Sequence, residues 1–150
     1  MDDHEYAYLR HHTRLNSKDP YSYFYLMYKV HKKRRSNGET PTRPVCSDVA
    51  SITNPIGKWV DLMLQPIAQS METYFKDSFS FKEIVDNVVL PPGARLFTAD
   101  AVSMYTNINT DAAMAVISAY IIEQQHTFTH YHAATLIRAL EIVMRNNIVK

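Results

Sequence analysis

The chain has 150 residues, enough for one ordinary domain or for one piece of a larger domain. Its hydrophobic content of 46% and charged content of 21% are typical of a folded globular protein, and no apolar stretch approaches the ~20 residues of a membrane-spanning helix, so we expect no membrane partner. The single cysteine excludes an intramolecular disulfide and a cysteine-based zinc site, and the polar N-terminus does not resemble a signal peptide, so we expect an intracellular protein.

The net charge of +1 is unevenly distributed along the sequence. Residues 29–35, KVHKKRR, carry +5 without an acidic residue, and the rest of the chain therefore carries −4. A compact cationic block on a mildly acidic body is typical of a local phosphate-binding surface. A solvated loop and a nuclear-import signal are alternatives for the same block, which is compatible with a nuclear location. The cations are Lys29, Lys32, Lys33, Arg34 and Arg35.

The first third of the chain predicts a basic β-hairpin after a polar lead-in. Residues 1–20 are polar and end in a turn signal, so we expect them to pack poorly. Residues 21–30 are dense in aromatic and apolar side chains and predict a strand, and residues 43–47 predict a second strand. The turn-rich sequence between them centres on Asn37 and Gly38, which places the cations near the hairpin tip.

The remaining elements are predicted to be helices and one further strand. Asn54 and the proline after it start a helix with apolar residues at helical spacing, and a kink or break is expected near Pro66. Because strands and helices do not alternate along the chain, the order indicates an α+β fold. The other expected elements are a helix over residues 79–89, a strand over residues 96–100, a helix from Thr110 and a helix over about residues 130–145.

The stretch LFTADAVSMYTNI, residues 96–108, carries the leading candidate site. It predicts a strand that ends at Asp100 and is followed by a sharp turn, which brings the side chain of Tyr105 near the Asp100 carboxylate. A divalent cation binds carboxylate oxygens, and a catalytic carboxylate needs a rigid element to hold it. An aspartate that ends a strand is also common as a turn cap, so this stretch alone does not identify a catalytic site.

Four segments follow one another along the chain: FYLMYKVHK at residues 24–32, PTRPVCSD at 41–48, KWVDLMLQPI at 58–67 and LFTADAVSMYTNI at 96–108. In this order they resemble the reverse transcriptase domain of Penelope-like retroelements and, more loosely, group II intron and telomerase-type enzymes. The resemblance covers roughly residues 20–150, and its motifs are specific in combination but not singly. It implies a right-hand polymerase fold, with a fingers-like region at residues 21–90 and a partial palm at residues 91–150.

The resemblance implies roles for individual residues. Asp100 matches the first metal-binding aspartate of the palm, with the backbone of Ala101 as a second metal contact, and the metal implied is Mg²⁺ or Mn²⁺. Tyr105 matches the residue that excludes a ribose 2′-hydroxyl, and Arg43 matches an arginine that grips the incoming triphosphate. The other residues implied to contact the nucleotide are Lys29, Lys32, Val102, Ser103 and Met104, and those expected to contact nucleic acid are Lys33, Arg34 and Arg35.

The implied function is RNA-directed DNA polymerisation, in which deoxynucleotides (dNTPs) are added to a primer on an RNA or DNA template by two-metal phosphoryl transfer. Members of the family carry a second aspartate pair and, before it, a glycine-containing segment, and neither follows Asp100 in this chain. One aspartate does not hold two metals, so we expect a fragment of a longer polymerase or the product of a truncated element. Apolar surface normally covered by the missing palm would then favour self-association.

Two other hypotheses remain open. One is a non-catalytic nucleic-acid-binding module that uses the basic hairpin alone, which differs from a polymerase in not depending on Asp100. The other is a zinc site, because His126 and His130 are spaced by one helical turn and His132 lies close to them in the sequence. Capping and surface positions explain these histidines better than a metal site does.

We predict that the purified 150-residue chain does not extend a primer. A two-metal mechanism needs more carboxylates than Asp100 alone provides. A primer-extension assay with Mg²⁺ or Mn²⁺, dNTPs and an RNA or DNA template tests this expectation, with a complete reverse transcriptase as the positive control. Metal-dependent extension by the chain alone would contradict it.

Overall fold

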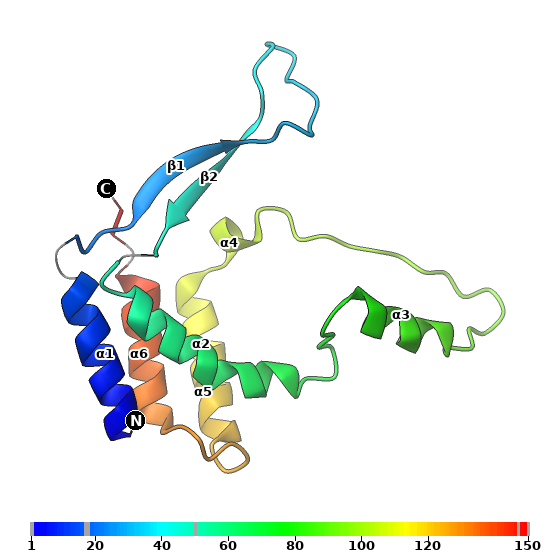
Figure 1. Cartoon of the computed structure of the whole chain (residues 1–150). Helices are drawn as coiled ribbons and strands as arrows, with labels where there is room; N and C mark the ends of the chain where they lie inside the picture. Colours follow the sequence, from blue (N-terminus) through cyan, green and yellow to red (C-terminus); the bar gives the residue numbers. More distant parts are fainter. Residues whose placement is uncertain (1, 17–18, 50, 147, 150) are drawn as a thin grey trace.

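A computed structural model describes residues 2–16, 19–49, 51–146 and 148–149 (Figure 1). These residues form six helices and one two-stranded antiparallel hairpin, which confirms the predicted α+β class. No helix in these ranges is both long and apolar enough to cross a lipid bilayer. In chain order the elements are α1 (Asp3–Asn16), β1 (Tyr23–Tyr28), β2 (Thr42–Ser47), α2 (Asn54–Gln69), α3 (Ser78–Asp86), α4 (Met104–Asn107), α5 (Thr110–Gln124) and α6 (Ala133–Arg145).

The N-terminal residues, expected to form a polar lead-in, instead form helix α1. Its start is fixed by two reciprocal hydrogen bonds: the Glu5 amide donates to Asp2 Oδ1 at 2.8 Å, and the Asp2 amide donates to Glu5 Oε2 at 2.8 Å. This capping box satisfies amides that have no partner within the first helical turn. Leu9 packs against the helical core, so even a mostly polar helix is held in place by one apolar contact face.

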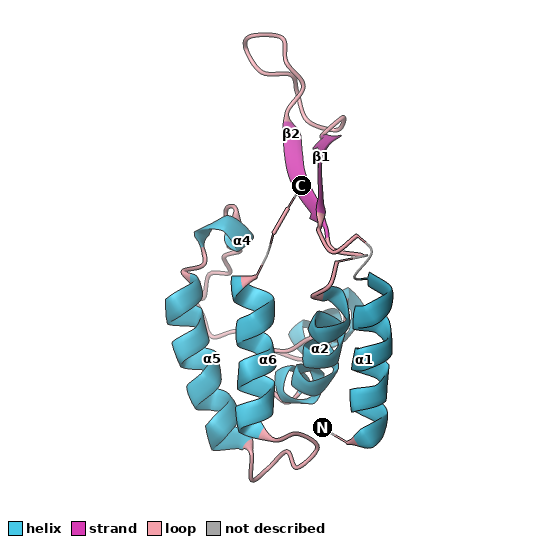
Figure 2. Cartoon of the chain, turned by 90° about the vertical axis from the view of Figure 1, so that its left-hand side faces the viewer, coloured by secondary structure: helices cyan, strands magenta, loops and turns pink. Residues whose placement is uncertain are grey.

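The hydrophobic core lies among α1, α2, α5 and α6; in Figure 2, α1, α5 and α6 stand upright, and α2 packs obliquely against α1 and α6. Leu136 of α6 and Ile121 of α5 are the most deeply buried side chains, at 0% and 1% exposure. The hydroxyl of Tyr131 donates to the Ile121 carbonyl at 2.9 Å, and burial raises the pKa of that hydroxyl. The buried apolar residues of the core are Trp59, Val60, Ile67, Met114, Ile121, Tyr131, Ala133, Leu136 and Leu140.

Helix α2 begins at the predicted residue, Asn54, with Pro55 in its first turn, where no intrahelical bond needs the missing amide. A kink or break was expected near Pro66, and α2 continues past it to Gln69 without a break. A proline in the last turn removes one hydrogen bond, while the adjacent Ile67 is buried in the core. Burial of the apolar stripe therefore outweighs the local loss at Pro66.

Residues 70–109 leave the helical bundle and return to it without contributing a buried side chain, and we call them the excursion. Helix α3 lies within it, in agreement with the helix predicted over residues 79–89. Asp77 caps α3 by accepting the Ser80 amide at 2.9 Å, and this hydrogen bond lowers the pKa of the Asp77 carboxyl. Figure 1 shows α3 projecting from the bundle, so local interactions hold this part of the chain.

The strand expected over residues 96–100 is not formed. These residues have no regular secondary structure, and Phe97 is 90% exposed. A strand satisfies its amides and carbonyls by pairing with a neighbouring strand. The described sheet contains only β1 and β2, and residues 96–100 do not join either of its free edges. Asp100 consequently lies in exposed coil rather than at the tip of a strand.

The carboxylate of Asp48 joins the hairpin to the helical bundle. Asp48 follows β2 directly, and its Oδ1 accepts hydrogen bonds from the hydroxyls of Ser22 at 3.0 Å, of Thr53 at 3.5 Å and of Ser51. Ser22 precedes β1, and Ser51 and Thr53 precede α2, so one carboxylate links both strands to the start of a core helix. The three hydroxyl-bearing residues are buried, and we call the four residues the hairpin joint.

Replacing Asp48 with Ala should lower the free energy of unfolding by about 1–3 kcal/mol, because three buried hydroxyls lose a shared acceptor. Urea denaturation followed by circular dichroism measures the change. Asp61→Ala is the matched control, since Asp61 is exposed and pairs with Gln65 on the same helix, and it should change stability by less than about 0.5 kcal/mol. Equal effects of the two substitutions would argue against the joint.

Candidate functional site

The strand register puts aromatic and cationic residues on one face of the hairpin. Side chains alternate between the faces of a strand, and directly paired residues share a face. Arg43 pairs with Met27, so Arg43 lies on the face of β1 that carries Tyr23 and Tyr25 and, one step beyond the strand, Lys29. We call Tyr23, Tyr25, Lys29 and Arg43 the mixed face. Bases stack on aromatic rings and phosphates pair with cations, so this face holds the two kinds of group that bind single-stranded nucleic acid.

The remaining cations, residues 32–35, lie in the exposed loop between the strands, as predicted. The Gly38 amide donates to the Arg35 carbonyl at 2.9 Å, and the Arg35 amide donates to the Glu39 carbonyl at 2.8 Å. Gly38 has a φ of 83°, a left-handed conformation that glycine adopts without strain. These bonds order the loop backbone and leave its charged side chains in solvent.

The segment after Asp100 turns sharply, as predicted, although it does not start from a strand. The side-chain amide of Asn107 donates to the Val102 carbonyl at 2.9 Å, and Ser103 has a φ of 49°, which is uncommon for a residue other than glycine. Helix α4 follows and carries Tyr105, which is 87% exposed. The other exposed residues of the segment are Asp100, Ala101, Val102, Ser103 and Met104.

The hairpin and the Asp100 segment lie at the same end of the helical bundle, as Figures 1 and 2 show. The N-terminus and the loop between α5 and α6 lie at the opposite end. Packing between elements joins β1 to β2, α2 to α1 and α6, and α5 to α6, whereas the hairpin and α4 are not packed on one another in the described part of the chain. The structure therefore brings both groups of predicted residues to one end of the molecule without joining them.

Metal ligands do not gather around Asp100 in the described residues. Within those ranges, no group of three or more His, Cys, Asp or Glu side chains is close enough to hold a metal ion. The histidine cluster is partly used in packing: a ring nitrogen of His130 lies 3.0 Å from the Met63 carbonyl, and its ring meets Phe128 and Tyr131 edge to face. These contacts favour a structural role for His130, which ties the loop between α5 and α6 to α2.

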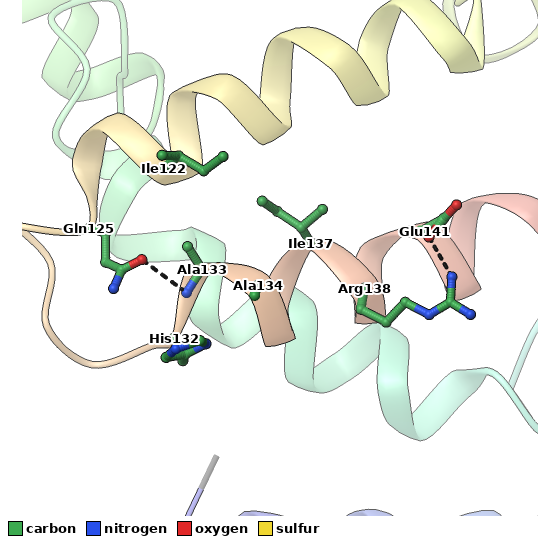
Figure 3. Close-up of a pocket in the computed structure, with 8 residues that line it drawn as sticks. All are labelled: Ile122, Gln125, His132, Ala133, Ala134, Ile137, Arg138 and Glu141. Atoms are coloured by element: carbon green, nitrogen blue, oxygen red, sulfur yellow. Dashed lines mark hydrogen bonds and ion pairs between the residues drawn. The ribbon is translucent and has the colours of Figure 1, made fainter.

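A groove of about 550 Å³ lies between α5 and α6, near the loop that joins them (Figure 3). Ile122 and Ile137 face each other across it. Two of its charged side chains pair with one another, because Arg138 Nη1 donates to Glu141 Oε2 at 2.6 Å. A binding site for a polar substrate presents converging polar groups that are free to bind it. The groove therefore does not compete with the hairpin end as a catalytic site.

Asp48 ends the segment PTRPVCSD, but the resemblance gives it no role, and it anchors the hairpin that carries Arg43. The available signal is compositional. Residues 47–53, SDVASIT, place one acid among hydroxyl side chains between a strand and a helix. An acid in such surroundings is a natural acceptor for buried hydroxyls.

No protein-family model, curated protein or solved structure matches the chain. The case for a function consequently depends on the ordered motifs and on the chemistry of the hairpin end.

Proposed function

We propose that the chain contributes the fingers and the first part of the palm of an RNA-directed DNA polymerase. The observation that carries the proposal is one ordered set of motifs: Lys-x-His-Lys at residues 29–32, Arg-Pro at 43–44 and Asp-x4-Tyr at 100–105. Their common location at the hairpin end of the bundle supports it, since residues that handle one nucleotide must lie on one side of the molecule. The resemblance to Penelope-like reverse transcriptases supplies the reaction class.

In this role the residues act mainly by position and charge, which is what phosphoryl transfer requires of a protein. Asp100 would hold Mg²⁺ or Mn²⁺, and the metal offsets charge on the phosphate oxygens when bound. The Arg43 guanidinium binds a phosphate through two parallel hydrogen bonds, and the Lys29 ammonium adds a point charge on the same face. Tyr105 occupies the space beside the sugar and favours a deoxynucleotide over a ribonucleotide.

Arg43 and Asp100 act on one nucleotide only if the hairpin and the excursion come together. Such a movement would cost no core packing, because the excursion buries no side chain and residues 96–101 are coil. Closure of flexible elements around a substrate commonly completes a catalytic site. Ordering of the Asp100 segment by the nucleotide is therefore part of the proposal.

Photocrosslinking with a photoreactive dNTP in the presence of Mg²⁺ tests the nucleotide-binding role. We expect label in residues 96–105 and in the hairpin, with better competition by unlabelled dNTPs than by ribonucleotides. Asp100→Asn should weaken metal-dependent labelling by at least about tenfold, since even groups that only support a metal ligand change metal affinity by this factor.

Glu83→Gln is the matched control, because Glu83 is an exposed carboxylate on the same excursion but lies outside the motifs. This variant should label like the unchanged chain. Labelling that is indifferent to both Asp100→Asn and removal of the metal would contradict the proposal.

A non-catalytic nucleic-acid-binding module is the second candidate function, and the mixed face of the hairpin favours it. Tyr23 and Tyr25 are exposed on the same face of the hairpin as Arg43, and the cationic loop continues from the same strand. Stacking and phosphate pairing on this surface need neither a metal nor Asp100. The two candidate functions are thus separable by the Asp100→Asn variant.

Fluorescence anisotropy with a single-stranded oligonucleotide measures this binding. We expect the logarithm of the association constant to fall linearly with the logarithm of salt concentration, with a slope of about −0.7 for each phosphate contacted. Tyr25→Ala should cost about 1–3 kcal/mol of stacking, and Asp100→Asn should leave affinity unchanged or slightly higher. Lys58→Ala, which removes a cation from α2, is the control and should keep the slope. Salt-independent binding would contradict this candidate function.

A further inference from the structure

We propose that Ser36 is a phosphorylation site for a basophilic serine/threonine kinase and that its phosphate weakens the binding of nucleic acid to the hairpin loop. The site itself is argued from the loop alone. Its effect on binding rests on the nucleic-acid-binding role proposed for the hairpin.

Ser36 lies in an accessible loop whose turn is held by only two backbone hydrogen bonds, which a kinase would open to bind the segment in an extended form. It is exposed and lies at the first central position of the turn that the Gly38 amide closes on the Arg35 carbonyl. Among the described residues, no hydrogen bond engages its hydroxyl. Residues 33–35 before it are exposed and have no regular secondary structure, so they can extend into a peptide-binding cleft without loss of core packing.

The charge pattern before Ser36 is the one that basophilic kinases recognise. Lys33, Arg34 and Arg35 occupy the three positions immediately before the serine. Kinases choose substrates largely by such charge patterns, and a run of cations fits an acidic recess. Thr98 offers an internal comparison, because it is exposed and has one cation, Arg95, three residues before it.

The reaction is an ordinary phosphoryl transfer from ATP. Ser36 Oγ attacks the γ-phosphorus, a new O–P bond forms, and the bond from that phosphorus to the β,γ-bridging oxygen breaks. ADP leaves, and the hydroxyl proton passes to the general base of the kinase. The product carries a phosphate ester at the tip of the hairpin.

The phosphate changes the electrostatics of the loop. Residues 29–41 hold five cations and one acid, a net charge of +4. A phosphoserine adds about −1.5 to −2 and pairs readily with neighbouring guanidinium groups, here those of Arg34 and Arg35. With about two fewer cations available to nucleic acid, affinity for a single-stranded oligonucleotide should fall on the order of tenfold at 0.1 M salt, with a shallower salt dependence.

The experiment incubates the whole chain with ATP and each of three basophilic kinases, the catalytic subunit of cAMP-dependent protein kinase among them, and maps phosphate by mass spectrometry. We expect Ser36 to be modified faster than Thr98. Ser36→Ala should remove the modification, Ser36→Thr should keep it, and a Lys33→Ala, Arg34→Ala double variant should lose most of it. A Lys58→Ala, Lys76→Ala double variant removes the same charge elsewhere and should be modified normally.

Anisotropy then compares the phosphorylated chain with the same sample after phosphatase treatment. Weaker oligonucleotide binding by the phosphorylated chain supports both parts of the proposal. Absence of phosphate on Ser36 with all three kinases, or modification that ignores the Lys33 and Arg34 substitutions, overturns the site. Equal binding with and without phosphate overturns the electrostatic effect. If the unmodified chain does not bind the oligonucleotide, both the nucleic-acid-binding role of the hairpin and its regulation by phosphate are contradicted. A phosphate found on Ser36 would still support the phosphorylation site.

Discussion

The position of the hairpin depends on the hydrogen bonds that the Asp48 carboxylate accepts. An isolated two-stranded hairpin is marginally stable in water, and all six residues of β1 are exposed, so packing over the strands does not hold it. Asp48 compensates by accepting hydrogen bonds from the buried hydroxyls of Ser22, Ser51 and Thr53, the last two of which also bond to each other at 3.0 Å. The cationic loop, the mixed face and Ser36 all extend from this joint, which sets the direction in which the protein presents its positive charge.

Exposed apolar surface is the second constraint on the molecule. Both faces of β1 carry exposed apolar or aromatic side chains, and helix α3 buries no residue. Val116 and Ile122 are exposed on α5 as well, although neighbouring residues of that helix form part of the core. Apolar area on this scale is typical of a surface that another molecule or another part of a protein covers. Self-association through it stays a prediction, and it is consistent with the polymerase hypothesis.

The parts of the fold that were predictable depend on short-range signals. The hairpin follows from two β-prone segments around Asn37 and Gly38, and the start of α2 follows from Asn54 and its proline. The strand at residues 96–100 was wrong as a prediction, because β-propensity describes how a residue fits beside a partner strand, and this segment pairs with neither strand of the hairpin in the described structure. Helix α1 was missed because one reciprocal cap and one narrow contact face leave little apolar pattern in the sequence.

The candidate site also has features that short-range signals predicted and features that they did not. The exposed cations of the loop and the sharp turn after Asp100 were predictable, because each depends on residues within a few positions. The distance between Arg43 and Asp100 was not, since it depends on how the hairpin and the excursion are each attached to the bundle. Both attachments depend on residues outside the motifs. The Asp48 carboxylate binds the hydroxyls of Ser22, Ser51 and Thr53, and the excursion is attached at the ends of α2 and α5.

The excursion also divides the chain into two structural halves. Helices α1 and α2 precede it and helices α5 and α6 follow it, and the main contact between the halves is α2 against α6. A break in the backbone within residues 70–109 would remove no core side chain and would leave that contact available to hold the halves together. The fold therefore has the layout of a split protein, in which two polypeptides suffice to assemble one core. Asp100, the residue proposed to bind the metal, lies in the excursion, where a break in the backbone would disturb the core least.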